Sequence, residues 1–204
     1  MPRSGDDLAT MTSTFILEGL RDPDNRAVWG EYVARYRPLL VSYARRLGLA
    51  EPDAEDVAQQ TLVSFSTAYQ DGKYEREKGR LRAWLFAIAR NQVVNWRRNQ
   101  RSREHQVGEP DSGTGYFASQ PDDKSMEAIW DEEWRAAVLA RCLAQVRSEV
   151  QPATYEAFEL FAYRGMAAED VARKLGMTAN AVFGAKRRIL RRVRELLPDM
   201  EEIW

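Results

Sequence analysis

The sequence predicts an all-α protein made of two small helical domains joined by a flexible acidic linker. Apolar residues recur at spacings of three and four through most of the chain, and the alternation typical of β-strands is nearly absent. Glycine and proline gather among acidic and small polar residues between His105 and Asp123, a composition typical of linkers. A chain of 204 residues has room for one ordinary domain or two small ones.

These patterns predict an N-terminal domain over residues 1–103, a flexible acidic linker over 104–124 and a C-terminal domain over 125–204. The first predicted helix runs from Trp29 to Leu49. Its expected inward side holds four apolar residues: Val33, Tyr36, Leu40 and Ala44.

A second helix is predicted from Ala54 to Tyr69, and its residues divide into two faces. The expected core stripe consists of Ala58, Thr61, Leu62, Phe65 and Tyr69. The other face is polar with an apolar centre and consists of Asp56, Gln59, Gln60 and Val63. Such a face is either a solvated surface or a docking site for another protein, and the pattern alone favours the first.

A loop is predicted over residues 70–80, followed by a long helix from Leu81 to about Arg101. Its expected inward residues are Trp84, Leu85, Ile88, Ala89 and Trp96. A polar stripe on the same helix combines asparagines and arginines: Asn91, Asn95 and Arg98 beside Arg90, Arg97 and Arg101. This stripe can follow a phosphate backbone, or it can simply solubilise the helix end.

The C-terminal domain is predicted to begin with helices near 126–150 and 153–163. Cys142 lies among apolar residues of the first, where we expect a small buried thiol. A short helix over Ala168–Leu175, a turn at residues 176–178 and a long helix over Ala179–Leu197 follow. A small Ala172, a turn Gly176 and an apolar Val182 have the spacing of a helix-turn-helix, although an ordinary helical hairpin would share it.

Charge is strongly segregated along the chain, although the formal net charge is only −1. Residues 71–103 hold ten basic and three acidic side chains, and residues 104–133 hold nine acidic side chains and one basic. Residues 173–194 hold eight basic side chains and no acidic one. Because phosphate binding depends on local charge density, the pattern favours a protein that contacts nucleic acid at two separate places.

Several classes of function are disfavoured. One cysteine and one histidine give neither a disulfide framework nor a cluster of soft zinc ligands, and we expect no metal or other cofactor. No membrane span or export signal is visible, so a cytoplasmic protein is expected. The motifs supply no paired carboxylates, no nucleophile with a base and no phosphate loop, so we do not expect an enzyme.

The order of three segments resembles the extracytoplasmic-function (ECF) sigma factors of bacterial RNA polymerase. Asp53–Tyr69, DAEDVAQQTLVSFSTAY, is similar to the helix of that family that binds core polymerase. Leu81–Arg98, LRAWLFAIARNQVVNWRR, is similar to its promoter-melting helix, and Glu169–Glu195 to the module that reads the upstream promoter element. The resemblance covers most of the chain outside the N-terminal arm and the linker.

The resemblance implies a role for each surface. Asp56, Gln59, Gln60 and Val63 would dock on the clamp helices of the largest polymerase subunit. The single-stranded minus-10 element would be held by residues of the basic loop and helix: Lys73, Arg76, Arg80, Arg90, Asn91, Asn95, Arg97, Arg98 and Arg101. The duplex minus-35 element would be bound by the last helix.

The geometry of a helix-turn-helix divides the minus-35 residues into two groups. Its second helix presents its N-terminal turns to the bases, which here brings forward Thr178, Asn180, Phe183 and Arg187. Basic residues farther along are expected near phosphates or the polymerase: Lys186, Arg188, Arg191 and Arg192. The family often has a basic residue directly after the valine, whereas Val182 is followed by Phe183, and Asn95 stands where relatives often carry aspartate.

Function is therefore predicted as an ECF-type sigma factor that binds core RNA polymerase and directs it to specific promoters for transcription initiation. The alternative is a stand-alone helix-turn-helix transcriptional regulator that binds an operator without polymerase. The resemblance leaves open the kind of regulator, an anti-sigma factor or a kinase.

Overall fold

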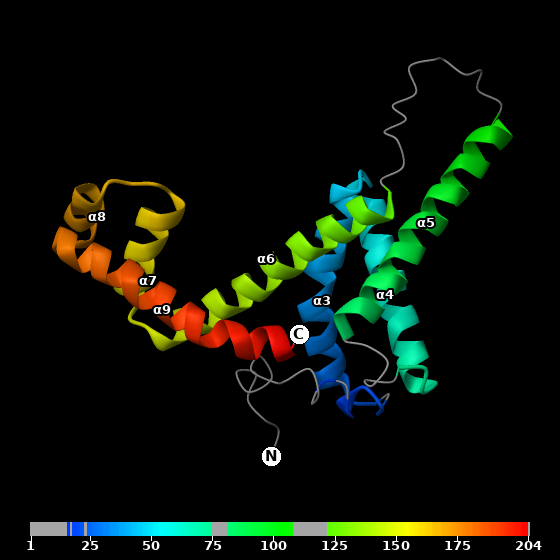
Figure 1. Ribbon diagram of the computed structural model, residues 1–204, viewed down its shortest axis with the longest axis horizontal. Helices are drawn as coiled ribbons and strands as arrows, with labels where there is room; N and C mark the ends of the chain where they lie inside the picture. Colours follow the sequence, from blue (N-terminus) through cyan, green and yellow to red (C-terminus); the bar gives the residue numbers. More distant parts are fainter. Residues whose placement is uncertain (1–15, 17, 23, 75–80, 108–121, 204) are drawn as a thin grey trace. The chain divides into compact units, whose positions relative to one another are not determined.

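The computed structural model describes residues 16, 18–22, 24–74, 81–107 and 122–203 (Figure 1). Every regular element in these ranges is a helix, so the all-α prediction is confirmed. The chain forms two compact units, unit 1 up to Trp134 and unit 2 from Arg135 to Ile203. None of the helices in the described ranges combines the length and apolar character needed to cross a bilayer.

Helix α3 (Arg26–Arg46) begins at Asn25, whose Oδ1 accepts a hydrogen bond from the backbone N–H of Val28 at 3.3 Å. It ends before the predicted Leu49, because Gly48 has a φ of +92°. Tyr36 and two further predicted core residues, Leu40 and Ala44, are buried. The prediction for Val33 is wrong: this side chain is 38% exposed, and Tyr32 takes the inward position one residue earlier.

Helix α4 (Glu51–Gln70) contacts both α3 and α5 (Leu81–Val107), as Figure 1 shows. Its predicted core stripe is confirmed as buried: Ala58, Thr61, Leu62, Phe65 and Tyr69. Helix α5 buries a straight row at spacings of four, formed by Leu81, Leu85, Ala89 and Val93. The predicted inward residues Trp84, Ile88 and Trp96 are partly buried at the sides of that row. The helix continues beyond the predicted end at Arg101.

Helix α6 (Asp123–Glu149) contains the division between the two units. Its first part belongs to unit 1 and buries Met126, Trp130 and Trp134. The predicted C-terminal domain begins earlier, at residue 125, and its functional boundaries stay a prediction. The linker predicted over 104–124 lies outside the described residues between 108 and 121, while its ends belong to α5 and α6.

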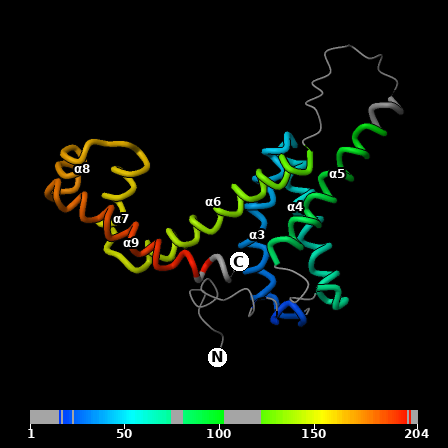
Figure 2. The backbone as a smooth tube through the Cα atoms, in the orientation of Figure 1, coloured from blue at the N-terminus to red at the C-terminus, as the bar shows by residue number. Residues whose placement is uncertain are grey.

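Unit 2 contains the rest of α6, followed by α7 (Pro152–Phe158), a π-helical turn η2 (Glu159–Tyr163), α8 (Ala168–Leu175) and α9 (Ala179–Ile203), which Figure 2 traces along the backbone. A single α-helix over 153–163 is predicted from the sequence. The π turn differs from that prediction and buries Leu160 while leaving Tyr163 exposed. Cys142 is fully buried, as expected.

Helices α8 and α9 are joined by a turn at Gly176, whose φ of +64° is the left-handed conformation that glycine adopts without strain. Ala172 on α8 and Val182 on α9 are both buried, in a core cluster with Val171, Ala185 and Leu160. The α9 residues that face this core and its extension recur at spacings of three and four: Val182, Ala185, Ile189, Val193 and Leu196. The opposite side of α9 is thereby held outward.

Candidate functional site

The first candidate surface is a face of α4 made of Asp56, Gln59, Gln60 and Val63, called here the docking face. All four side chains are exposed, and Val63 is 58% exposed although it is apolar. On the opposite side of the helix, buried hydroxyls hold the backbone: Thr61 Oγ1 donates to the Val57 carbonyl at 2.7 Å, and Ser66 Oγ to the Leu62 carbonyl at 2.8 Å. The buried core stripe of α4 holds the helix in unit 1, so the docking face is a preformed surface with an apolar side chain at its centre.

The second candidate surface is the polar stripe of α5. Asn91, Asn95 and Arg98 are exposed on one side of the helix, as their spacing predicts. Arg101 is also exposed. The side chains of Asn91, Asn95 and Arg98 are available to a ligand that follows the helix axis.

The remaining two arginines of this stripe are held by contacts within unit 1. Arg90 Nε donates to Asp123 Oδ1 of α6 at 3.0 Å. Arg97 Nη2 donates to the backbone carbonyl of Leu47, just after α3, at 2.6 Å. Burial lowers the pKa of Arg97, and the contact supports the end of α3, a structural role that charge alone does not reveal.

The basic loop is described only in part. Lys73 is exposed and pairs with Asp71 at 2.8 Å. The predicted contacts Arg76 and Arg80 lie outside the described residues.

Sequence reasoning did not single out Arg82, the first arginine of α5. Its guanidinium pairs with Asp131 of α6 and lies over the ring of Trp134, 5.6 Å from the centroid. The one feature of the sequence that pointed to Arg82 is its position in the basic stretch 71–103.

The third candidate surface is on α9. Asn180, Phe183 and Arg187 are exposed and share one side of the helix, at spacings of three and four. Phe183 is 51% exposed, and one edge of its ring meets Phe161 at a centroid distance of 5.3 Å. Phe183 therefore borders the core and also remains accessible to a ligand.

Other predicted residues of α9 have contacts within unit 2. Thr178 Oγ1 accepts from the Ala181 backbone N–H at 3.2 Å and so caps α9. Lys186 Nζ lies 5.2 Å from the centroid of Phe161, and Arg191 pairs with Glu195 at 3.8 Å. Arg188 is exposed.

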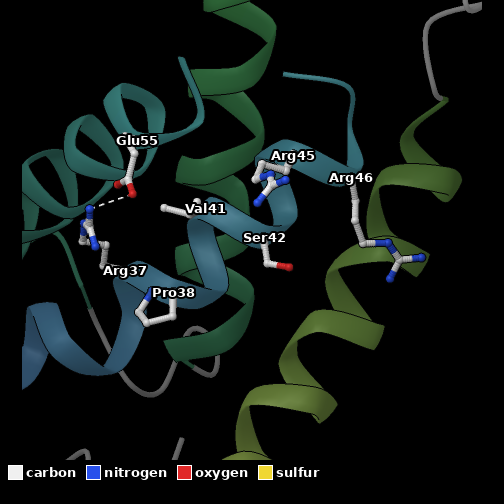
Figure 3. A pocket seen from close by; sticks show the side chains of 7 residues that line it. All are labelled: Arg37, Pro38, Val41, Ser42, Arg45, Arg46 and Glu55. Atoms are coloured by element: carbon white, nitrogen blue, oxygen red, sulfur yellow. Dashed lines mark ion pairs between the residues drawn. The ribbon is translucent and has the colours of Figure 1, made fainter. Parts of the chain in front are cut away.

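A shallow hollow of about 560 Å³ lies on α3 and α4, lined by the side chains in Figure 3: Arg37, Pro38, Val41, Ser42, Arg45, Arg46 and Glu55. Each of its arginines pairs with a glutamate of unit 1, at 2.7 Å for Arg37 and Glu55, 2.8 Å for Arg45 and Glu51, and 2.6 Å for Arg46 and Glu132. Because these pairs compensate the positive charge, the hollow is a weaker candidate for nucleic acid than the stripe of α5.

Comparison with known proteins adds independent information. A family model described as sigma-70 region 2 matches residues 32–103. The ECF RNA polymerase sigma factor SigL of Mycobacterium tuberculosis is 32% identical over 179 residues, which cover 87% of this chain and 89% of the relative. The RNA polymerase sigma factor CnrH of Cupriavidus metallidurans is 30% identical over 165 residues, covering 78% and 81%. A solved structure of CnrH in complex with the cytosolic domain of CnrY has a TM-score of 0.35 at 22% identity, covering 91% of this chain and 96% of that one.

Proposed function

Because the chain belongs to the ECF family of RNA polymerase sigma factors and so directs transcription initiation, we propose a division of that work among its surfaces. The docking face of α4 binds core polymerase. The stripe of α5 binds the single-stranded minus-10 element, and the exposed side of α9 binds the duplex minus-35 element. The protein acts without covalent chemistry, in the cytoplasm.

The observation that carries the proposal is the exposed docking face, which lies within the matched region 2. Val63 is an apolar side chain at 58% exposure in the centre of this face, where a docked partner would cover it. The neighbouring Asp56 and glutamines supply polar contacts around that apolar centre, the arrangement of a protein interface. A stand-alone regulator would leave this face without a purpose.

The minus-10 assignment is supported by the exposed amides and guanidinium of Asn91, Asn95 and Arg98 on one side of α5. Amides and guanidinium groups bind phosphates and base edges, and a single row suits a single strand. On α9 the exposed Asn180 can pair with adenine and Phe183 can meet a thymine methyl. Arg187 extends this base-facing side by one turn, and Arg188 supplies a phosphate contact nearby.

The test is a charge reversal on the docking face. Asp56→Arg is expected to abolish capture of core polymerase and promoter-specific transcription while leaving the unfolding temperature unchanged, because the side chain is exposed. Glu156→Arg on α7 is the matched control, since it reverses an exposed charge outside the docking face. Full capture of polymerase by a folded Asp56→Arg protein would contradict the proposal.

A second experiment separates the sigma factor from a stand-alone regulator. The chain alone is expected to bind duplex promoter DNA weakly and to form an open complex only with core polymerase, because two small basic surfaces offer limited preorganised contact. Tight sequence-specific binding by the isolated chain would favour the regulator. The regulator of the protein itself, an anti-sigma factor or a kinase, stays a prediction.

A further inference from the structure

The first part of α6 is anchored on unit 1 by aromatic packing. Trp130 is 2% exposed and meets the rings of Tyr43 and Phe86 at centroid distances of 5.3 and 5.6 Å. Trp134 stacks near Tyr36 at 6.3 Å. These contacts bury apolar surface of the helix segment, and Arg46 of α3 adds ion pairs to Glu132 and Glu133.

With the segment anchored, two of its carboxylates meet the arginines of α5. Asp123 pairs with Arg90, and Asp131 pairs with Arg82. The two aspartates are as far apart in sequence as the two arginines and pair with them in reverse order, so the two helices run antiparallel at these contacts. The pairs thus form a short charge ladder beside the exposed stripe of α5.

The ladder has the chemistry of a nucleic-acid contact. A carboxylate accepts hydrogen bonds from a guanidinium through two oxygens, as a phosphate does. The side chains of Asp123 and Asp131 are 75% and 38% exposed, so these ion pairs are weak and can be exchanged for a phosphate. Glu127 is exposed on the same segment and adds negative charge that repels DNA.

We infer that Asp123 and Asp131 occupy the phosphate-binding positions of Arg90 and Arg82, and that a single-stranded DNA must displace them to bind α5. This inference rests on the minus-10 role proposed for α5. The anchored α6 segment then acts as an internal competitor that weakens DNA binding by the free protein. The apolar anchor stays in place during the exchange, because only the guanidinium and carboxylate groups have to move.

The test measures binding of a short fluorescein-labelled single-stranded oligonucleotide to the full chain at low salt. Asp123→Asn and Asp131→Asn are each expected to tighten binding about two- to fivefold, the range that release of an exposed ion pair allows. Glu127→Gln is the matched control: it removes one negative charge from the same helix without releasing an arginine. The smaller gain in affinity expected for Glu127→Gln measures how much the loss of one negative charge contributes by itself.

Arginine variants test whether the tighter DNA binding of the aspartate variants depends on the ion pairs of the ladder. In an Arg90→Ala background, Asp123→Asn should tighten binding no more than Glu127→Gln does. A tightening that persists without Arg90, or one that only equals the control in the wild-type background, would overturn the inference. Thermal unfolding checks that the variants are folded. Their unfolding temperature should equal that of the wild type, because the packing of Trp130 and Trp134 is unchanged.

The same set of variants separates this inference from the proposed function. If Arg90→Ala and Arg82→Ala together leave open-complex formation with core polymerase undiminished, the DNA role of this part of α5 fails, and the inference fails with it. If the arginine variants weaken the complex but the aspartate variants behave like Glu127→Gln, the inference alone fails.

Discussion

Arg192 of α9 forms a bidentate ion pair with Glu149 of α6: Nε donates to Oε2 at 2.7 Å and Nη2 donates to Oε1 at 3.1 Å. The third nitrogen, Nη1, donates to Glu195 at 3.3 Å. Arg192 therefore joins two helices within unit 2 and contributes to the stability of that unit, while its predicted place near phosphates or the polymerase stays a prediction. The hydrogen bonds from Arg192 lower the pKa of Glu149 below its usual value of 4.5.

This pair makes the stability of unit 2 depend on pH. A carboxyl with a depressed pKa in the folded state stabilises the protein above its unfolded pKa and loses that contribution as the pH falls through the folded value. Glu149→Gln should therefore lower the urea midpoint near neutral pH by a small amount, because both groups are partly exposed. The difference from wild type should shrink below about pH 4. If the stability difference between wild type and Glu149→Gln stayed constant as the pH falls from neutral to below about 4, the Arg192–Glu149 pair would not be its source.

Truncation of the aromatic anchor should destabilise unit 1. Trp130→Ala removes a buried ring between Tyr43 and Phe86 and is expected to cost about 3–5 kcal/mol of unfolding free energy. Far-ultraviolet circular dichroism in denaturant gives the measurement, since loss of a tryptophan alters fluorescence directly. Leu139→Ala on the same helix is the control, because Leu139 is exposed. Equal stability of the two variants would mean that the first part of α6 is not part of the unit 1 core.

The two glycines of the α8–α9 region should respond in opposite directions to alanine. Gly176→Ala forces a side chain into φ of +64° and is expected to cost about 1 kcal/mol. Gly184→Ala places a Cβ inside α9 where, apart from its chain neighbours and the adjacent backbone of α9, no atom lies within 4 Å, and it should stabilise by roughly 0.5–1 kcal/mol through helix propensity. Thermal unfolding of both variants checks the signs. Destabilisation by Gly184→Ala would indicate crowding around α9 that the structure does not contain.

Base readout by α9 is tested with a randomised minus-35 element and core polymerase. Asn180→Ala should relax preference at one base pair, by about 1–3 kcal/mol of discrimination, and Phe183→Ala should relax preference for thymine at a neighbouring position. Arg191→Ala should instead weaken binding evenly across sequences and lower the dependence on salt. Unaltered base preferences in both Asn180→Ala and Phe183→Ala would remove these residues from the recognition surface.

The sequence predicted those features that a single helix determines. The spacing of Asp56 and Val63 against Leu62 and Phe65 separates an outward from an inward side of α4, and the structure has this separation. The same kind of pattern wrongly placed Val33 in the core. Tyr32 and Val33 are adjacent apolar residues, and the spacing alone does not show which of the two faces inward.

Features that depend on a partner helix could not be predicted. The spacing of Met126, Trp130 and Trp134 shows that α6 has an apolar side, but not that unit 1 covers it, and the acidic residues around them resemble a continuation of the linker. The charge of Arg97 likewise gives no sign that its guanidinium ends on the Leu47 carbonyl. Such contacts are set by tertiary packing, which leaves no local pattern.

The buried thiol of Cys142 provides unit 2 with its own reporter of opening. It is the single cysteine of the chain, and its side chain is 0% exposed. A thiol-specific reagent can react only while the surrounding helices are separated, so the labelling rate follows the equilibrium between closed and open forms when closing is fast. The native protein thus allows the opening of unit 2 to be followed in water, with and without promoter DNA, and no probe has to be introduced.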